Sequence, residues 1–132
     1  MKKLTPVLIV ECIEACLPFW VERFGFTKTV EVPAGDRLGF VILNHGPIEL
    51  MLQSRASVAE DVPALARDAY RSALYIEVGD LAPIVRATKG LEIVVPERTT
   101  FYGAREIGVR DPAGNVINFA HFAAQQAQDP SS

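Results

Sequence analysis

No run of apolar residues in this 132-residue chain reaches the length of about 18–20 that a helix needs to cross a bilayer. We therefore expect no membrane-spanning segment and no membrane partner. The chain starts with two lysines, but Glu11 and Glu14 soon follow and no small-residue cleavage site appears, which argues against a secretory signal. The sequence thus predicts a cytoplasmic protein.

Clusters of basic residues are also lacking, since 13 Lys and Arg are outnumbered by 16 Asp and Glu, for a net charge of −3. Tight binding to a phosphate backbone needs such a cluster, so we expect no nucleic-acid partner.

Cysteine is scarce. Cys12 and Cys16 are too few for a disulfide scaffold and lack the further ligands of a metal site, so reduced thiols are predicted.

The motifs of nucleophilic catalysis and of nucleotide binding are missing as well. No serine lies in a glycine-flanked elbow with a histidine partner, and the nine glycines form no phosphate-binding loop. What remains is ordinary globular composition, with 49% apolar and 22% charged residues. A chain of this size buries about two-thirds of its unfolded surface, so the sequence predicts a single domain with a real core.

The first part of the chain predicts one strand, one helix and three more strands. Residues 5–10 (TPVLIV) have the composition of a strand. A helix is predicted from Cys16 to Gly25, because Pro18 fits only a first turn and glycine suits the end. Strands are expected at 26–32, 38–43 and 48–53. Residues 54–72 are polar and rich in alanine, which indicates a linker with one or two helical turns.

The same order of elements then returns. The pattern predicts a strand at 74–78, a helix at 81–89 capped by Asp80, and strands at 92–95, 106–110 and 116–122. Asp111 starts a turn before the last strand, and its carboxylate is expected to bond backbone N–H groups there. Glu11 falls on Gly79 at an offset of 68 residues, as Gly46 falls on Gly114.

A repeat on this scale defines the architecture, because each unit alone would leave one face of its sheet bare. The predicted fold class is α+β: two tandem βαβββ modules, at 4–53 and 73–122, are expected to form a curved, open-barrel mixed sheet with the helices outside. A polar tail is expected at 123–132. Alternation places uniformly apolar residues on the helix side of the strands. The opposite face is mixed, polar and aromatic, which suits a ligand cavity.

With PVLIVECIEACLPFWVERFGF in the first module and YGAREIGVRDPAGNVINF in the second, the chain resembles the vicinal oxygen chelate superfamily. This superfamily contains glyoxalase I, extradiol dioxygenases, fosfomycin resistance proteins and bleomycin resistance proteins. The resemblance covers about residues 4–122. It is closest to the bleomycin resistance proteins in FWVERFGF, RDPAGN and VINF. It implies paired βαβββ modules, usually a homodimer, with crevices between modules or chains.

The metalloenzymes of that superfamily take ligands from the first and last strands of each module. The resemblance places these positions at Thr5, Glu49, Ala73 and Asn118. Only Glu49 is a competent ligand, since alanine offers no donor and neutral Thr and Asn oxygens bind metals weakly. His45 is expected in a turn and His121 on the other sheet face. The sequence therefore predicts no metal and no cofactor.

Glu49 has three interpretations. It pairs with a cationic ligand, or it is a strand carboxylate bonded to a neighbouring side chain, or it is a general base whose pKa burial raises. Four apolar or aromatic side chains are expected to form either a wall for a flat ligand or the interface of a dimer: Met51, Tyr75, Phe101 and Tyr102.

The expected ligand-binding cavity comprises Thr5, Glu49, Met51, Tyr75, Phe101, Tyr102, Glu106 and Asn118. Trp20 shares a helix stripe with Phe24 and is predicted to lie in the core.

These observations favour a metal-independent small-molecule binding protein, a homodimer that sequesters an aromatic or cationic ligand such as a bleomycin-type antibiotic. One alternative is a lyase, isomerase or dioxygenase-type enzyme that uses Glu49 with an incomplete or atypical metal site. Another is a pure interaction protein whose cavity is filled by its own side chains.

Overall fold

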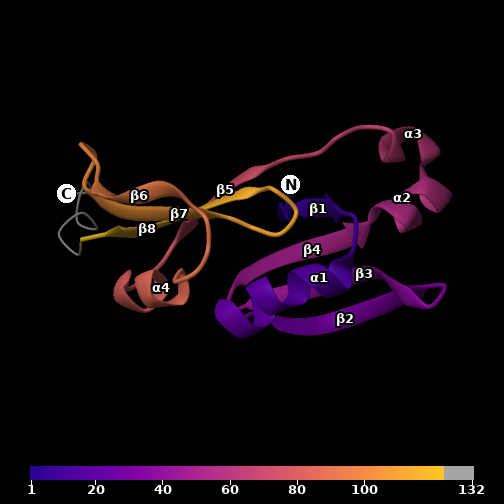
Figure 1. Ribbon diagram of the computed structural model, residues 1–132, viewed down its shortest axis with the longest axis horizontal. Coiled ribbons are helices and arrows are strands. Elements are labelled where there is room, and N and C mark those ends of the chain that lie inside the picture. The colour runs from indigo at the N-terminus through magenta and orange to yellow at the C-terminus, as the bar shows by residue number, and fades with distance from the viewer. Residues whose placement is uncertain (124–132) are drawn as a thin grey trace. The chain divides into compact units, whose positions relative to one another are not determined.

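A computed structural model describes residues 1–123 of the chain, which divides into two compact units, Met1–Arg71 and Ser72–Ser132. Both contain one βαβββ module, and the strands of each module form a four-stranded mixed sheet (Figure 1). The predicted α+β class and tandem modules are confirmed. The predicted tail lies outside the described residues except for Ala123.

Unit 1 is a mixed sheet covered by a helical segment on one face. Its elements are β1 (Val7–Val10), α1 (Ile13–Leu17), η1 (Pro18–Arg23), β2 (Thr27–Ala34), β3 (Arg37–His45), β4 (Ile48–Ser54), α2 (Arg55–Asp61) and α3 (Pro63–Ala66). The strand order is β1-β4-β3-β2, in which β1 runs parallel to β4 and the other pairs are antiparallel. Helix α1 contacts β3 and β4.

The first helix begins at Ile13, three residues before the predicted start at Cys16. Pro18 lies inside the helical segment, where α-helix α1 gives way to the wider π-helical turns of η1. A proline has no N–H to donate to the carbonyl four residues earlier, so the α-helical pattern stops there without ending the segment. Gly25 follows with a φ of 79°, as expected for a residue that closes a helix.

The core of unit 1 is centred on Trp20, which is fully buried as predicted. Its ring lies edge-on to Phe19 and Phe26, with centroid distances of 5.0 and 5.2 Å. Edge-to-face pairs of this kind add to the stability that buried area alone supplies. The buried apolar residues of the strands beneath are Leu8, Val10, Val41, Leu43, Leu50 and Leu52.

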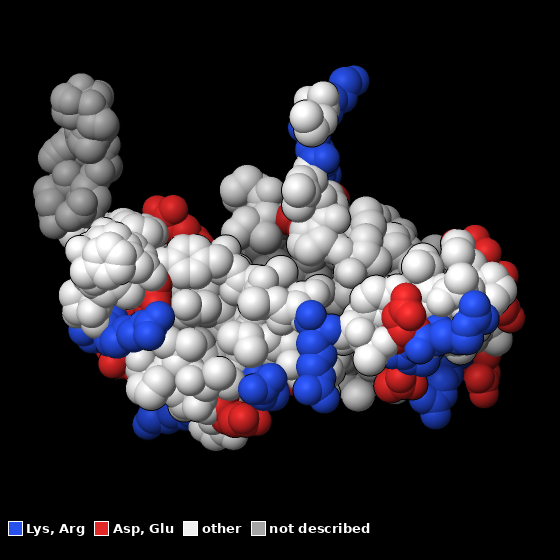
Figure 2. Space-filling model, turned by 90° about the horizontal axis from the view of Figure 1, so that it is seen from above, with Lys and Arg blue, Asp and Glu red and all other residues white. Residues whose placement is uncertain are grey.

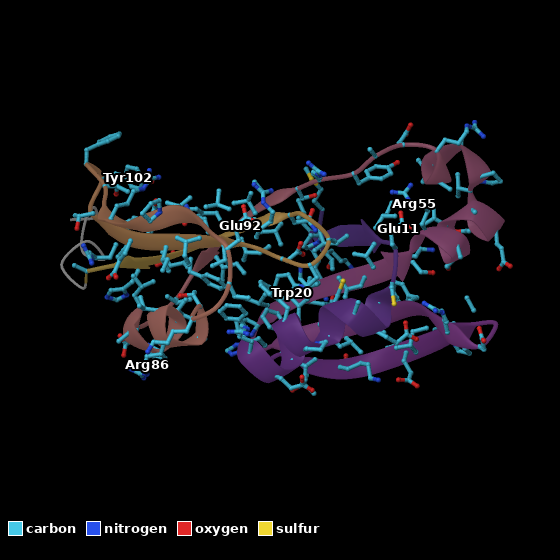
Figure 3. All side chains as sticks on the ribbon, viewed as in Figure 1. Glu11, Trp20, Arg55, Arg86, Glu92 and Tyr102 are labelled. Carbon is cyan, nitrogen blue, oxygen red and sulfur yellow. The ribbon has the colours of Figure 1, made fainter. Side chains whose placement is uncertain are left out.

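The predicted linker packs on unit 1 through Arg55. Its Nε donates to Glu11 Oε2 at 2.6 Å, and its Nη1 donates to the carbonyls of Ala66 and Asp68 at 2.6 and 2.8 Å. Figure 3 shows Glu11 and Arg55 pointing toward one another. One guanidinium therefore joins the loop after β1 to the end of α3.

Unit 2 repeats the plan with a single helix. Its elements are β5 (Ala73–Glu77), α4 (Ala82–Ala87), β6 (Ile93–Thr99), β7 (Ala104–Arg110) and β8 (Val116–Phe122), in the order β5-β8-β7-β6. The predicted turn is confirmed: Asp111 Oδ1 accepts from the backbone N–H groups of Ala113 and Asn115 at 3.0 and 2.8 Å. Asn115 Oδ1 in turn accepts from the Ser72 N–H at 2.7 Å and holds the start of β5.

Strand β6 extends four residues past Val95, where the sequence predicts its end. Pro96 removes one backbone donor, but β6 is an edge strand that pairs only with β7, and a proline is tolerated there. The register shifts between Val95, which pairs with Gly108, and Arg98, which pairs with Glu106. Three residues on β6 thus span two on β7, so a bulge changes which side chains of β6 share a face.

No helix among residues 1–123 is long and apolar enough to span a membrane.

Replacement of Trp20 by alanine tests whether this ring organises unit 1. We expect Trp20→Ala to lower the free energy of unfolding by about 3–5 kcal/mol, because the change leaves a large cavity in the core. Leu4→Ala, at an exposed apolar position of the same unit, changes it by less than about 0.5 kcal/mol. Denaturant titration followed by far-UV circular dichroism measures both, and equal losses contradict the assignment.

Candidate functional site

The face of unit 2 opposite its apolar core carries a buried carboxylate, Glu106, whose exposed fraction is 0%. Each of the four strands contributes a polar side chain to the group around Glu106, and Glu77 on β5 lies on the same face through its pairing with Ala120. Tyr75 on β5 pairs with Asn118 on β8, Asn118 pairs with Gly108 on β7, and Arg98 on β6 pairs with Glu106. Glu106 lies two residues from Gly108, so all these residues share one face of the pleated sheet.

Five hydrogen bonds from four side chains converge on Glu106. The hydroxyls of Tyr75 and Tyr102 each donate to Oε2 at 2.6 Å. Arg98 donates to Oε1 through Nε at 3.1 Å and Nη2 at 3.0 Å, and Asn118 Nδ2 donates to the same oxygen at 3.3 Å. We refer to these five residues as the Glu106 cluster.

These bonds decide the ionisation of the cluster. Burial raises the pKa of the Glu106 carboxyl, but the hydrogen bonds from Tyr102, Tyr75, Arg98 and Asn118 outweigh burial and lower that pKa to about 2. Burial raises the pKa of the Tyr75 hydroxyl, and its bond to Glu106 raises that pKa further. At neutral pH the cluster therefore contains an ionised carboxylate and a protonated Tyr75.

The residues around Glu106 are largely exposed. Tyr75 is 50% exposed, Tyr102 is 45% exposed and the Arg98 side chain is 55% exposed. Phe101, next in the β6–β7 connection, is almost entirely exposed and lies edge-on to Tyr102 at 5.0 Å. Figure 3 shows Tyr102 at the end of unit 2 where this connection lies. A molecule that approaches this face meets two phenol rings and a guanidinium, with Glu106 beneath them.

Arg98 is the member of the cluster that the sequence analysis missed. The predicted strand ended at Val95, so Arg98 was not placed on this face. Even with a longer strand, strict alternation would put Val95 and Arg98 on opposite faces, and the bulge between them puts both on the same one. The only available signal was the proline at position 96, which is typical of an edge strand or a bulge.

Asn118 contributes a second, unused polar atom. Its Oδ1 is buried and has no hydrogen-bond partner, while its Nδ2 is held by Glu106. Gly108 lies beside it, and a Cβ added there would be 3.2 Å from that oxygen and 2.8 Å from Val95 Cγ2. The close approach of Val95 explains why this position has no side chain.

Unit 1 carries a smaller cluster around Glu49 on β4. Glu49 Oε1 accepts from Thr5 Oγ1 at 3.1 Å and forms an ion pair with Lys3 Nζ at 2.6 Å. The hydrogen bond from Lys3 lowers the pKa of the Glu49 carboxyl; burial opposes it less strongly, and the bond from Thr5 lowers the pKa further. Of the three interpretations of Glu49, the general base with a raised pKa is therefore disfavoured. We refer to Glu49, Thr5 and Lys3 as the Glu49 cluster.

The expected site residues thus fall into two groups. Tyr75, Tyr102, Glu106 and Asn118 meet at one carboxylate in unit 2, whereas Thr5 and Glu49 meet in unit 1. Met51 lies two residues after Glu49, half-buried on the same strand, and Phe101 contacts the site only through Tyr102.

A metal centre does not fit these residues. No group of three or more His, Cys, Asp or Glu side chains within residues 1–123 is arranged to hold a metal ion. Of the four positions that the resemblance singles out, Ala73 supplies no donor, and Glu49 is already bound to Lys3 and Thr5. His121 Nδ1 lies 3.1 Å from the Val78 carbonyl, apart from the Glu106 cluster.

The Glu106 cluster gives the protein a specific sensitivity to acid. The pKa of Glu106 is about 2 in the folded protein and ordinary, near 4.5, in the unfolded chain, so its stabilising effect is complete above the unfolded value. This stabilising effect is lost as the pH falls toward the pKa of Glu106 in the folded protein. We expect about 3 kcal/mol of unfolding free energy to disappear between pH 5 and 2. Glu106→Gln flattens this dependence.

The control is Glu97→Gln, which removes a partly exposed strand carboxylate paired with Arg105 in the same sheet. Denaturant titrations at several pH values measure all three proteins. If Glu106→Gln and the wild type lose stability in parallel on acidification, the ionised state assigned to Glu106 is wrong.

Comparison with solved structures gives the same architecture. A glyoxalase/bleomycin resistance protein/dioxygenase from Nocardioides is 21% identical, with a TM-score of 0.72 over 94% of this chain and 85% of that one. Lactoylglutathione lyase from Agrobacterium tumefaciens is 16% identical, with a TM-score of 0.70 over 92% and 94%. A bleomycin-binding protein complexed with bleomycin is 18% identical, with a TM-score of 0.65 over 93% and 100%. At these identities the likeness shows the fold.

A search of curated proteins gave no match. The model of one family, the Glyoxalase/Bleomycin resistance protein/Dioxygenase superfamily, matches residues 4–119, which is nearly the whole chain. The resemblance read from the two repeated segments is thereby confirmed at the level of the superfamily. The chain belongs to the glyoxalase/bleomycin resistance protein/dioxygenase superfamily.

Proposed function

We propose that this chain is a small-molecule-binding protein that holds an aromatic or cationic ligand without a metal. The observation that carries the proposal is the Glu106 cluster, in which a buried carboxylate fixes two half-exposed phenol rings and a guanidinium on one sheet face. Rings held in this way are ready to stack on a flat ligand, so binding costs little ordering of side chains.

The ionisation of the two clusters favours binding over proton transfer. A general base that works near neutral pH needs a pKa close to neutrality. The pKa values of Glu49 and Glu106 are both lowered, and Glu106 already accepts five hydrogen bonds. Both carboxylates are weak bases in this setting. Their chemistry suits the positioning of neighbouring groups and the attraction of cations.

The bleomycin-binding protein among the structural neighbours was solved with bleomycin bound, which supports ligand binding as a use of this fold. By that analogy the ligand is a bleomycin-type antibiotic or another aromatic or cationic small molecule. The resemblance to the superfamily further implies a homodimer, and the sequence predicts a cytoplasmic location. A nucleic-acid partner is disfavoured. On the face drawn in Figure 2, acidic and basic side chains are intermixed and form no continuous basic patch.

The second candidate is an enzyme of the same superfamily, a lyase, isomerase or dioxygenase type, that uses Glu49. One observation favours it: Glu49 lies at a position where the resemblance implies a metal ligand, half-buried, with its side chain 17% exposed. A metal there would need further ligands from a second chain.

Removal of the aromatic rings tests the proposed function. We expect Tyr75→Ala and Tyr102→Ala each to weaken binding of a bleomycin-type antibiotic by about tenfold or more, because each removes a stacking surface. Tyr70→Ala is the matched control, since Tyr70 belongs to unit 1 and its hydroxyl binds only Asp68. Titration followed by the shift in melting temperature measures affinity, and circular dichroism confirms folding. Unchanged affinity in both variants contradicts this site.

Glu49→Gln separates the two candidate functions. If a cationic ligand replaces Lys3 at this carboxylate, we expect its affinity to fall by about tenfold while the unfolding free energy changes by less than ~1 kcal/mol. Glu31→Gln is the control, because Glu31 is a strand carboxylate of unit 1 that also pairs with a lysine, Lys28.

Elemental analysis of the same proteins, purified without chelator, completes the comparison. Near-stoichiometric Ni, Zn or Mn in the wild type that is lost in Glu49→Gln supports the enzyme and contradicts metal-free binding. Unchanged affinity together with altered melting identifies Glu49 as a structural residue.

A further inference from the structure

The Glu106 cluster fixes the direction of every hydrogen bond that its tyrosines offer to a ligand. An ionised carboxylate is an acceptor only, and each phenol has a single proton. The hydroxyls of Tyr75 and Tyr102 both donate that proton to Glu106 Oε2. What remains on each phenol oxygen is a lone pair, so toward a ligand both tyrosines accept hydrogen bonds and cannot donate them.

The two phenol oxygens are also close together. Each lies 2.6 Å from the same atom, Glu106 Oε2, so no more than about 5 Å separates them. Asn118 Oδ1 belongs to the same cluster and is buried without a partner. A buried acceptor with no donor is costly, and one N–H or one water molecule placed beside it would remove that cost. The cluster thus has two phenol oxygens that can accept from a ligand, and a third oxygen, Asn118 Oδ1, that is buried without a donor.

Arg98, in contrast to the two phenol oxygens, can only donate hydrogen bonds. Its Nε and Nη2 bind Glu106, and its Nη1 takes no part in those bonds, in a side chain that is 55% exposed. A guanidinium has only hydrogen-bond donors, so Arg98 Nη1 can bind only an acceptor atom of a ligand. The charges of Arg98 and Glu106 offset one another. The cluster itself therefore has no net charge, and the exposed Glu77 is a further carboxylate on the same face.

We propose that the Glu106 cluster binds a neutral, flat aromatic molecule with an amide-like edge. Its N–H donors meet the oxygens of Tyr75 and Tyr102, its carbonyl-type acceptor meets Arg98, and its ring stacks on the exposed phenols. An aromatic primary carboxamide or a lactam-type heteroaromatic ring has this edge. The inference rests on the proposed function and narrows its ligand from aromatic or cationic compounds to neutral aromatic amides. Glu106 touches no ligand and acts as a positioning residue.

Three naphthalene probes that differ only in the edge group test the proposal on the intact chain. 2-Naphthamide presents donors and an acceptor, methyl 2-naphthoate presents an acceptor only, and 2-naphthoate is an acceptor with negative charge. We expect calorimetric titration to give 2-naphthamide at least a tenfold lower Kd than either of the others. This comparison requires no variant and does not depend on how substitutions fold.

Single substitutions then test whether the two phenol oxygens cause the preference for the amide over the ester. Tyr75→Phe and Tyr102→Phe keep the rings and delete the accepting oxygens, so we expect each to reduce the preference for the amide over the ester by threefold or more. Tyr70→Phe, the matched control in unit 1, leaves the preference unchanged. Circular dichroism checks that each variant folds.

The other outcomes each overturn the inference in a distinguishable way. Equal binding of amide and ester overturns the amide edge and leaves aromatic binding standing, whereas tightest binding of 2-naphthoate makes the ligand an anion held by Arg98. Failure of all three probes and of a bleomycin-type antibiotic overturns the proposed function as well. If no probe binds and Tyr75→Phe or Tyr102→Phe converts a dimer to a monomer in gel filtration, this face is an interface with a second copy.

Discussion

The sheet of unit 2 is organised around one interaction, the burial of the ionised Glu106 carboxylate. A buried charge is costly unless its hydrogen bonds are satisfied, so the donors must arrive from fixed places. They come from β5, β6 and β8 and from the connection before β7, which means that a slip of β5, β6 or β8 would remove at least one of these donors. The same bonds that satisfy the carboxylate set the rings of Tyr75 and Tyr102. The arrangement of polar and aromatic side chains on this face is therefore a consequence of how the charge is buried.

The two modules share the same order of strands and helices, but each holds its carboxylate in a different electrostatic environment. In unit 2 the carboxylate lies on β7, is fully buried and is held by four side chains. In unit 1 it lies on β4, is half-buried, and is held by Thr5 and by Lys3, which belongs to the segment before the first strand. A cation carried by a long, largely exposed side chain is easily exchanged, whereas a network of four donors is not. The two faces thus have different chemistry even though the strands around them correspond.

Most of the fold could be predicted because it depends on local patterns. Alternation placed Tyr75, Glu106 and Asn118 on one face, and turn composition located Asp111, since both signals lie in neighbouring residues. Arg98 could not be placed, because a bulge shifts the register in a way that alternation does not show. The α-to-π change at Pro18 was missed for the same kind of reason: the proline rule describes where a helix breaks, and here the helix only widens. The lowered pKa of Glu49 depends on Lys3, a contact across 46 residues that no local pattern indicates.

Trp20 has one more consequence, for spectroscopy. It is the only tryptophan in the chain, and it is fully buried in unit 1 with its indole N–H unpaired. An indole in an apolar surrounding without a polar partner emits at short wavelength, and contact with water shifts that emission to the red. Tyr75 and Tyr102 belong to unit 2, whereas Tyr70 belongs to unit 1 together with the tryptophan. Tyrosine emission therefore mixes the two modules, while the long-wavelength emission of the single indole records the loosening of unit 1 alone.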